Sequence, residues 1–180
     1  DDVFLLKINS TSLMKSHEDR SMKLIEHIIK NNESLNKIIS DDEIKFMQNI
    51  IHPGENNKGF VYQIVSNEVN GLDVDKFDYL QRDVKMVGQN NFFTCDRLIN
   101  SVTVINENIC YPVQCFHQIL SLYEMRYNLH KQIYLHKAVL SIEFMICELM
   151  VLMDSILNIS GSIDDISEFC KLSDSYILES

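Results

Sequence analysis

Residues 70–83 hold a dense set of ionisable side chains, and three of them recur every fourth residue: Asp75, Tyr79 and Asp83, with Lys76 alongside. On a helix, each four-residue step rotates a side chain by only about 40°, so these groups share one face. A carboxylate can ligate a metal, an ammonium can neutralise phosphate oxygens, and a phenol with a second carboxylate can contact a sugar. The same spacing also fits a solvated face with ion pairs between helical turns.

A second candidate stripe consists of Arg126, His130, Tyr134 and Lys137. At helical spacing these cations and this phenol lie on one side, where they could bind phosphate and stack on a ring. The alternative is an ordinary polar face whose opposite side meets a core. Neither stripe names a function by itself.

The elements that must position these residues are mostly helical. Helical periodicity begins after Ser16, a good N-cap, with Asp19 three residues on as its capping-box partner, and Asn31 ends it. Asp73 caps the helix that carries the first stripe, and Gly88 closes it. The helices predicted further along the chain cover 40–51, 60–66, 74–87, much of 114–157, 163–170 and 172–178.

A β-hairpin is predicted over 101–105 and 109–113, joined through Asn106, Glu107 and Asn108. The helical pattern of 114–157 is too long for one globular helix, so we expect at least one break. Its apolar end, 142–157, contains three acidic residues, which indicates a buried helix rather than a membrane span. Gly161 should separate it from the last two helices.

The sequence therefore predicts a mainly α fold with one small hairpin, an irregular lead-in over 1–15 and one domain over 16–180. Hydrophobic residues make up 46% of the chain, with 5 Gly, 2 Pro and no Trp, which argues against a turn-rich β sandwich. The net charge of −10 excludes a dedicated surface for duplex nucleic acid but leaves room for a small basic pocket.

The cysteines number five, without a CxxC pair, and are expected to be reduced. The first residues lack the charged and apolar regions of a signal peptide. We therefore expect an intracellular protein, nuclear or cytoplasmic, that does not enter a membrane.

A series of segments in one order carries a family resemblance. The segments are 60–67, 70–79, 82–83, 89–92, 126–130 with Tyr134, His136 and Lys137, then 163–165 and 171–174, preceded by His17 and Glu18 in a helix with Glu26 and His27. Together they resemble the C-terminal part of the HD domain of the SAM-and-HD-domain deoxynucleoside triphosphate (dNTP) triphosphohydrolases. The resemblance covers roughly 16–180.

The resemblance implies an HD-domain-like helical fold and a dGTPase-type reaction, in which a dNTP yields a deoxynucleoside and tripolyphosphate during dNTP catabolism. It implies a divalent metal cofactor, whether Fe, Zn, Mn or Mg. Asp75 corresponds to a catalytic aspartate that ligates this metal. His17 corresponds to a catalytic histidine near the phosphates.

The resemblance also implies a set of substrate-binding residues. Lys76 and Arg126 correspond to groups that bind phosphate. Tyr79 corresponds to the aromatic residue that lies on the deoxyribose and excludes a 2′-hydroxyl. Asp83 corresponds to the carboxylate that accepts from the 3′-hydroxyl, and Tyr134 to another residue of the sugar pocket.

The resemblance also implies regulation by nucleotides. Members of the family form homo-oligomers, either dimers or tetramers, when GTP or a dNTP binds at sites separate from the active site. Arg97, His136 and Lys137 fall where those allosteric nucleotides are contacted. Pro112 and Gln114, however, stand where the family has basic contacts.

The metal site is where the chain departs from the family. An HD domain uses two histidines and two aspartates, yet no His-Asp dipeptide occurs here and no histidine precedes His17. Asp75 is the one ligand of the four that finds a match, and one carboxylate cannot hold a catalytic transition metal by itself. The chain is therefore expected to be inactive alone. Three interpretations remain open: part of a longer enzyme, an inactive paralogue that binds nucleotides or assembles with other chains, or an enzyme with unrelated ligands.

Overall fold

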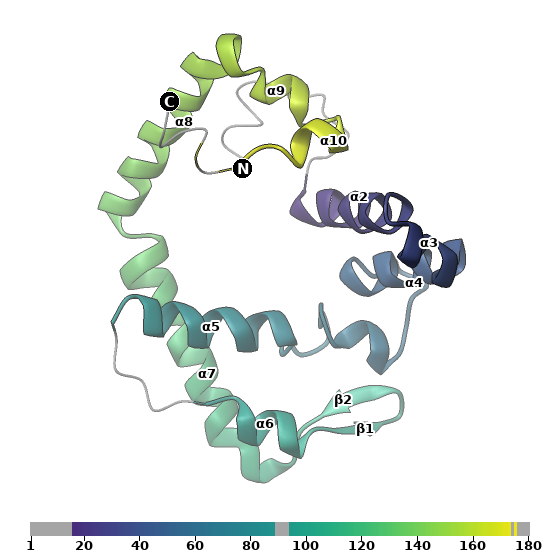
Figure 1. The fold of residues 1–180 in the computed structure, drawn as a ribbon. Coiled ribbons are helices and arrows are strands. Elements are labelled where there is room, and N and C mark those ends of the chain that lie inside the picture. The colour runs from purple at the N-terminus through teal and green to yellow at the C-terminus, as the bar shows by residue number, and fades with distance from the viewer. Residues whose placement is uncertain (1–15, 89–93, 174, 176–180) are drawn as a thin grey trace. The chain divides into compact units, whose positions relative to one another are not determined.

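The computed structural model of the chain describes residues 16–88, 94–173 and 175, and the chain divides into two compact units. The first unit comprises Asp1–Gln48 and Leu140–Ser180, and the second comprises Asn49–Val139. In the described residues, helices predominate and the one sheet is a two-stranded hairpin, which confirms the predicted mainly α class (Figure 1). The lead-in predicted over 1–15 and the matching segment 89–92 lie outside the described residues.

The N-terminal part of the first unit contains α2 (His17–Lys30), α3 (Glu33–Ile38) and most of α4 (Asp41–Ile51). The Ser16 hydroxyl accepts from the Asp19 amide at 3.1 Å, and the Asp19 carboxylate accepts from the Ser16 amide at 3.2 Å. This capping box confirms the predicted start of α2.

Helix α3 is not predicted by the sequence pattern. The pair Asn31-Asn32 indicates a helix end, but the Asn32 carboxamide also accepts from the amides of Ser34 and Leu35 at 3.0 and 3.1 Å. Asn32 therefore caps a new helix directly after α2.

The C-terminal part of the first unit contains most of α8 (Lys137–Leu157), with α9 (Ile159–Ser162) and α10 (Ile166–Phe169). Two expectations are corrected here. Gly161 lies inside α9, and the break after α8 falls instead at Asn158, the N-cap of α9, which has a left-handed conformation (φ 51°). The helix expected over 163–170 is shortened to α10, and most of 172–178 lies outside the described residues.

Helix α8 is not the buried helix that the sequence pattern indicates. Cys147 is its buried residue, packed with Ile159 and Ile163, whereas Leu152 and Ile156 are 75% and 83% exposed. Apolar residues occur around the whole circumference of α8, and the residues that follow it, Ile159 and Ile163 with Leu172, cover only a small part of it. Across the described residues, no helix has the length and apolar character that a membrane crossing requires.

The second unit positions the candidate stripes. Its elements are η1 (Phe60–Gln63), α5 (Val74–Met86), α6 (Asp96–Ser101), β1 (Thr103–Ile105), β2 (Asn108–Cys110), η2 (Val113–Cys115), α7 (Phe116–Leu129) and the π-helix η3 (His130–Tyr134). The helix predicted over 60–66 is wrong, because only the single 3₁₀ turn η1 forms. Gln63 ends this turn buried, donating to the Asn108 side chain and accepting from the Ile109 amide, both at 2.8 Å.

The hairpin has a tighter connection than predicted. Thr103 pairs with Cys110 and Ile105 with Asn108, so two residues rather than three form the turn. These are Asn106 and Glu107, with φ of 49° and 61°, as a type I′ turn requires.

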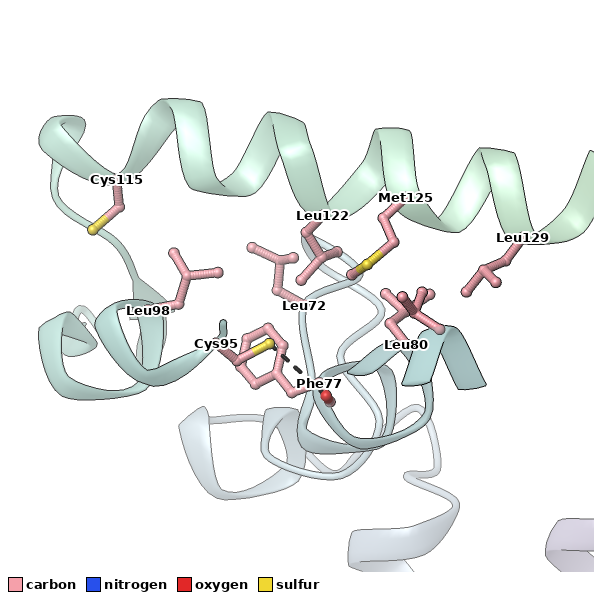
Figure 2. Close-up of a cluster of buried hydrophobic side chains, with 10 residues drawn as sticks. Leu72, Phe77, Leu80, Cys95, Leu98, Cys115, Leu122, Met125 and Leu129 are labelled. Carbon is pink, nitrogen blue, oxygen red and sulfur yellow. Dashed lines mark hydrogen bonds between the residues drawn. The ribbon is translucent and has the colours of Figure 1, made fainter. Parts of the chain in front are cut away.

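The core of the second unit lies between α5 and α7 (Figure 2). Leu80 from α5, Leu122 from α7 and Leu98 from α6 are fully buried. Burial of one leucine side chain contributes about 1.5–3 kcal/mol. Cys95 also enters the core, and its thiol donates to the Phe77 carbonyl at 3.8 Å. This packing fixes the two helices against each other.

The long helical region after residue 114 is interrupted, as expected. The Leu135 amide donates to the His130 carbonyl at 2.9 Å, five residues back, which defines the π-helix. Leu135 then leaves helical geometry, and α8 begins at Lys137. The predicted stripe from Arg126 to Lys137 assumes a uniform helix. Because the helix is interrupted at Leu135, Lys137 does not continue the face that carries Arg126 and Tyr134.

Candidate functional site

The candidate site residues flank the core where α5 meets α7. On α5, Tyr79 and Asp83 each precede a core residue, Leu80 and Val84, by one position. On α7, Arg126 directly follows the core residue Met125. A one-residue offset turns a side chain by about 100°, which moves it from the core to the rim of the helix contact. Both helices therefore carry polar groups along the same edge of their shared core.

Tyr134 and Asp83 join the π-helix to α5. The Tyr134 hydroxyl donates to Asp83 Oδ2 at 2.5 Å, across a sequence separation of 51 residues. Burial raises the pKa of Tyr134 well above its ordinary value, and the hydrogen bond and charge of Asp83 raise it further. The His130 ring packs edge-on against Tyr134 with centroids 5.0 Å apart. Asp83 is thus a half-buried acceptor held by a phenol from another element.

Tyr79 and Arg126 form a second link between the helices. Burial raises the pKa of Tyr79, and the charge of Arg126, with a hydrogen bond from its guanidinium, acts in the opposite direction. Both side chains are half-buried. A phenol ring beside a guanidinium offers a surface for a sugar and a donor fork for phosphate.

Lys76 is held by a residue that sequence reasoning treated only as a helix cap. Its ammonium donates to Asp73 Oδ2 at 2.6 Å, and its amide donates to Asp73 Oδ1 at 3.0 Å. Asp73 is 4% exposed. The i, i+3 spacing of an Asp cap and a Lys is a signal that could have indicated this pair.

Asp75 lies on the exposed side of the first turn of α5. The described residues contain no group of three or more His, Cys, Asp and Glu side chains that could hold a metal ion. The divalent metal implied by the resemblance therefore does not fit the donor set in this part of the chain. The role of Asp75 as a metal ligand stays a prediction.

His17 begins α2 in the first unit and is not among the residues that the second unit brings together. Its Nε2 lies 3.0 Å from Glu18 Oε1, and its side chain is 80% exposed. Its predicted role near phosphates is untested by these contacts.

The predicted allosteric residues lie at opposite ends of α7. Arg97 on α6 lies 2.9 Å from the side-chain amide of Gln118, near the start of α7. His136 and Lys137 follow its far end, and the Ala138 amide donates to His136 Nδ1 at 3.2 Å. The 18 residues from Gln118 to His136 span about 25 Å of helix, so one chain does not bring the three together around one nucleotide.

Comparison with known proteins gives relatives with HD-domain names. The chain is 44% identical to an HD domain-containing protein of Acanthamoeba polyphaga mimivirus over 180 residues, which cover 99% of this chain and 38% of that protein. It is 40% identical to the deoxynucleoside triphosphate triphosphohydrolase SAMHD1 homolog of Dictyostelium discoideum over 163 residues, which cover 89% of this chain and 31% of that protein. It is 31% identical to the human deoxynucleoside triphosphate triphosphohydrolase SAMHD1 over 198 aligned positions, which cover 91% of this chain and 32% of that protein.

No family model matches the chain. The chain spans between about 31% and 38% of the length of these relatives. The similarity nevertheless extends over nearly all of its own residues, including α5 and α7. This similarity to HD-domain and dNTP triphosphohydrolase proteins, over about a third of their length, confirms the resemblance to part of an HD domain that the sequence motifs carry.

Proposed function

We propose that the chain is a dNTP triphosphohydrolase-like protein whose second unit holds the sugar and phosphates of a dNTP along the edge of α5 and α7. The proposed reaction is dGTPase-type removal of the intact triphosphate, which leaves a deoxynucleoside. The observation that carries this proposal is the contact of Tyr134 with Asp83 beside the Tyr79–Arg126 pair. An intracellular location, nuclear or cytoplasmic, goes with such a substrate.

Each residue has a proposed role that its chemistry supports. Asp83 accepts from the sugar 3′-hydroxyl, and Tyr134 fixes the orientation of that carboxylate. The Tyr79 ring lies on the deoxyribose, where a 2′-hydroxyl would be excluded. Arg126 and Lys76 bind phosphate oxygens, where cations stabilise the charge that develops during phosphoryl transfer.

Binding can be tested separately from turnover. Calorimetric titration of the chain with dGTP, GTP and deoxyguanosine should show that dGTP binds more tightly than GTP. The Asp83→Ala variant should weaken dGTP and deoxyguanosine alike by about tenfold or more, because one hydrogen bond to a charged group is lost. The Arg126→Ala variant should lose far more affinity for dGTP than for deoxyguanosine.

Lys85 provides the matched control, because it is an exposed cation near the end of α5. The Lys85→Ala variant should bind all three ligands as the unaltered chain does. Equal binding of dGTP by the unaltered chain and by the Asp83→Ala and Arg126→Ala variants would contradict the proposed site. Turnover is measured as tripolyphosphate release from dGTP with Mn²⁺, Fe²⁺ or Mg²⁺ added.

A second candidate function is a catalytically inactive HD-domain module that binds nucleotides and assembles with further copies. The lack of a metal-binding cluster in the described residues favours it. The placement of Arg97 and His136 at opposite ends of α7 also suits nucleotides shared between copies, as in a dimer or tetramer. Light scattering should then show oligomers that form with GTP or dGTP while no tripolyphosphate is released. A monomer indifferent to nucleotides would exclude this candidate.

A further inference from the structure

Asp73 makes more contacts than a helix cap needs. Its Oδ1 accepts from the Lys76 amide at 3.0 Å, which is the capping bond. Its Oδ2 accepts from the Asn67 amide at 3.2 Å and from the Lys76 ammonium at 2.6 Å. Three donors from two segments therefore fix this carboxylate.

The surroundings of Asp73 strengthen its hold on Lys76. Asp73 is 4% exposed, and the Lys76 side chain is 19% exposed. The charge of Asp73 also adds to the raised pKa of Tyr111 and of Tyr123, which burial raises first, so both phenols lie within range of this charge. A buried carboxylate requires a partner, because an isolated charge is costly in a low dielectric.

Lys76 cannot offer its full charge to a phosphate while it is paired in this way. An ammonium has three donors, and Asp73 occupies one of them. A charge-assisted bond of this kind is roughly twice as strong as a neutral one. A phosphate that approaches Lys76 therefore has to share the ammonium with Asp73.

We propose that Asp73 is a positioning residue that acts through Lys76 and sets how strongly the site prefers a triphosphate over an uncharged nucleoside. The proposal rests on the proposed function, since Lys76 must face phosphate. Asp73 fixes the position of the long Lys76 side chain and neutralises part of the charge of its ammonium. The site then gains phosphate affinity only by weakening an existing ion pair.

The Asp73→Asn variant tests this, because asparagine caps helices as well as aspartate does. Its neutral oxygen holds the ammonium less strongly. We expect inorganic tripolyphosphate and dGTP to bind about threefold to tenfold more tightly, which corresponds to one released unit charge at close range. Deoxyguanosine should bind with unchanged affinity. A purely structural role of Asp73 would instead weaken all three ligands together.

A double-mutant cycle with Lys76→Gln shows whether the effect passes through Lys76. Glutamine removes the charge but still offers Asp73 a donor. In the Lys76→Gln background, Asp73→Asn should change tripolyphosphate affinity by less than about twofold. An equal gain in both backgrounds would mean direct repulsion by Asp73 and would overturn the proposal. Lys85→Gln is the matched control for loss of a cation from α5.

The ion pair itself can be followed without a nucleotide. In ¹⁵N-lysine spectra, the unaltered chain should show one ammonium protected from exchange, which Asp73→Asn removes. Absence of that signal from the unaltered chain would overturn the proposal even if dGTP binds. Failure of the unaltered chain to bind either dGTP or tripolyphosphate would reject the proposed function, and the phosphate preference with it. If Asp73→Asn does not fold, Asp73→Ser, also a good cap, takes its place in the cycle.

Discussion

Tyr134 on the π-helix donates a hydrogen bond to Asp83 on α5 at 2.5 Å, and this bond ties together two elements that are 51 residues apart. Hydrogen bonds to charged groups contribute about 1.5–3 kcal/mol each. Tyr134 is a partly buried residue that packs against the core of the second unit, so the bond forms at the rim of this core. It is therefore a link in the packing of the second unit as well as part of the proposed sugar site.

The Tyr134→Phe variant should lower the free energy of unfolding by about 1–2 kcal/mol, because Asp83 loses its donor while the ring is retained. Urea denaturation followed by circular dichroism measures this. The Tyr127→Phe variant is the control, since Tyr127 is 60% exposed on α7. Equal stability of Tyr134→Phe and the unaltered chain would show that the bond contributes nothing in solution.

The Leu80→Ala variant should destabilise the second unit by about 2–5 kcal/mol, because Leu80 is fully buried between α5 and α7 and its truncation leaves a cavity. The Leu152→Ala variant removes the same atoms from an exposed position of α8 and should change stability by less than about 0.5 kcal/mol. Denaturant unfolding of both variants checks the prediction. Comparable losses would indicate that the exposed face of α8 is covered in solution.

Alkaline pH should destabilise the second unit. Burial, with the charge of Asp73 adding to it, raises the pKa of Tyr111 to about 12. An unfolded tyrosine titrates near pH 10. Since the folded pKa is the higher one, the stabilisation is complete below pH 10 and is lost as the pH rises from about 10 to 12.

Thermal unfolding measured at intervals across that pH window should show a falling midpoint. The Tyr111→Phe variant should show a shallower fall, because one proton-linked group is gone, while Tyr79, Tyr123 and Tyr134 still contribute. An identical slope in both proteins would exclude Tyr111 as a linked group.

Cysteine labelling should distinguish the thiols by burial. Cys170 is exposed, whereas Cys95, Cys115 and Cys147 are buried. Burial raises the pKa of Cys95 from 9.0 to about 11, which lowers its reactive thiolate fraction about 100-fold at pH 8. With iodoacetamide and mass spectrometry, Cys170 should react first and Cys95 only after denaturant is added. Early modification of Cys95 would show that the α5–α6 packing opens readily.

Local signals in the sequence predict several elements well. The capping box of Ser16 and Asp19 and the Asp73 cap each depend on residues within one turn, so the starts of α2 and α5 follow from the sequence. The hairpin follows from the turn residues between two short apolar runs. The sharing of one face by Tyr79 and Asp83 follows from helical geometry alone.

Other features depend on packing that no local pattern contains. The start of α6 lacks a side-chain cap, because Cys95 turns into the core instead. The π-helix ends with a hydrogen bond from the Leu135 amide to the His130 carbonyl, and this widened turn has no residue signature. The turn at 60–63 stops early because Gln63 binds the hairpin, a contact 45 residues away. The spacing of Asp73 and Lys76 indicates that they can pair, but the burial of Asp73 depends on packing that the spacing does not contain.

The division of the chain has a consequence for its biosynthesis. The second unit is continuous from residue 49 to 139, whereas the first unit draws on both flanking segments. During translation, all of the second unit is synthesised, and leaves the ribosome, ahead of residues 140–180, and domains generally fold as units with the N-terminal parts first. Helices α5 and α7 can therefore acquire their native packing before the C-terminal segment of the first unit is available to fold.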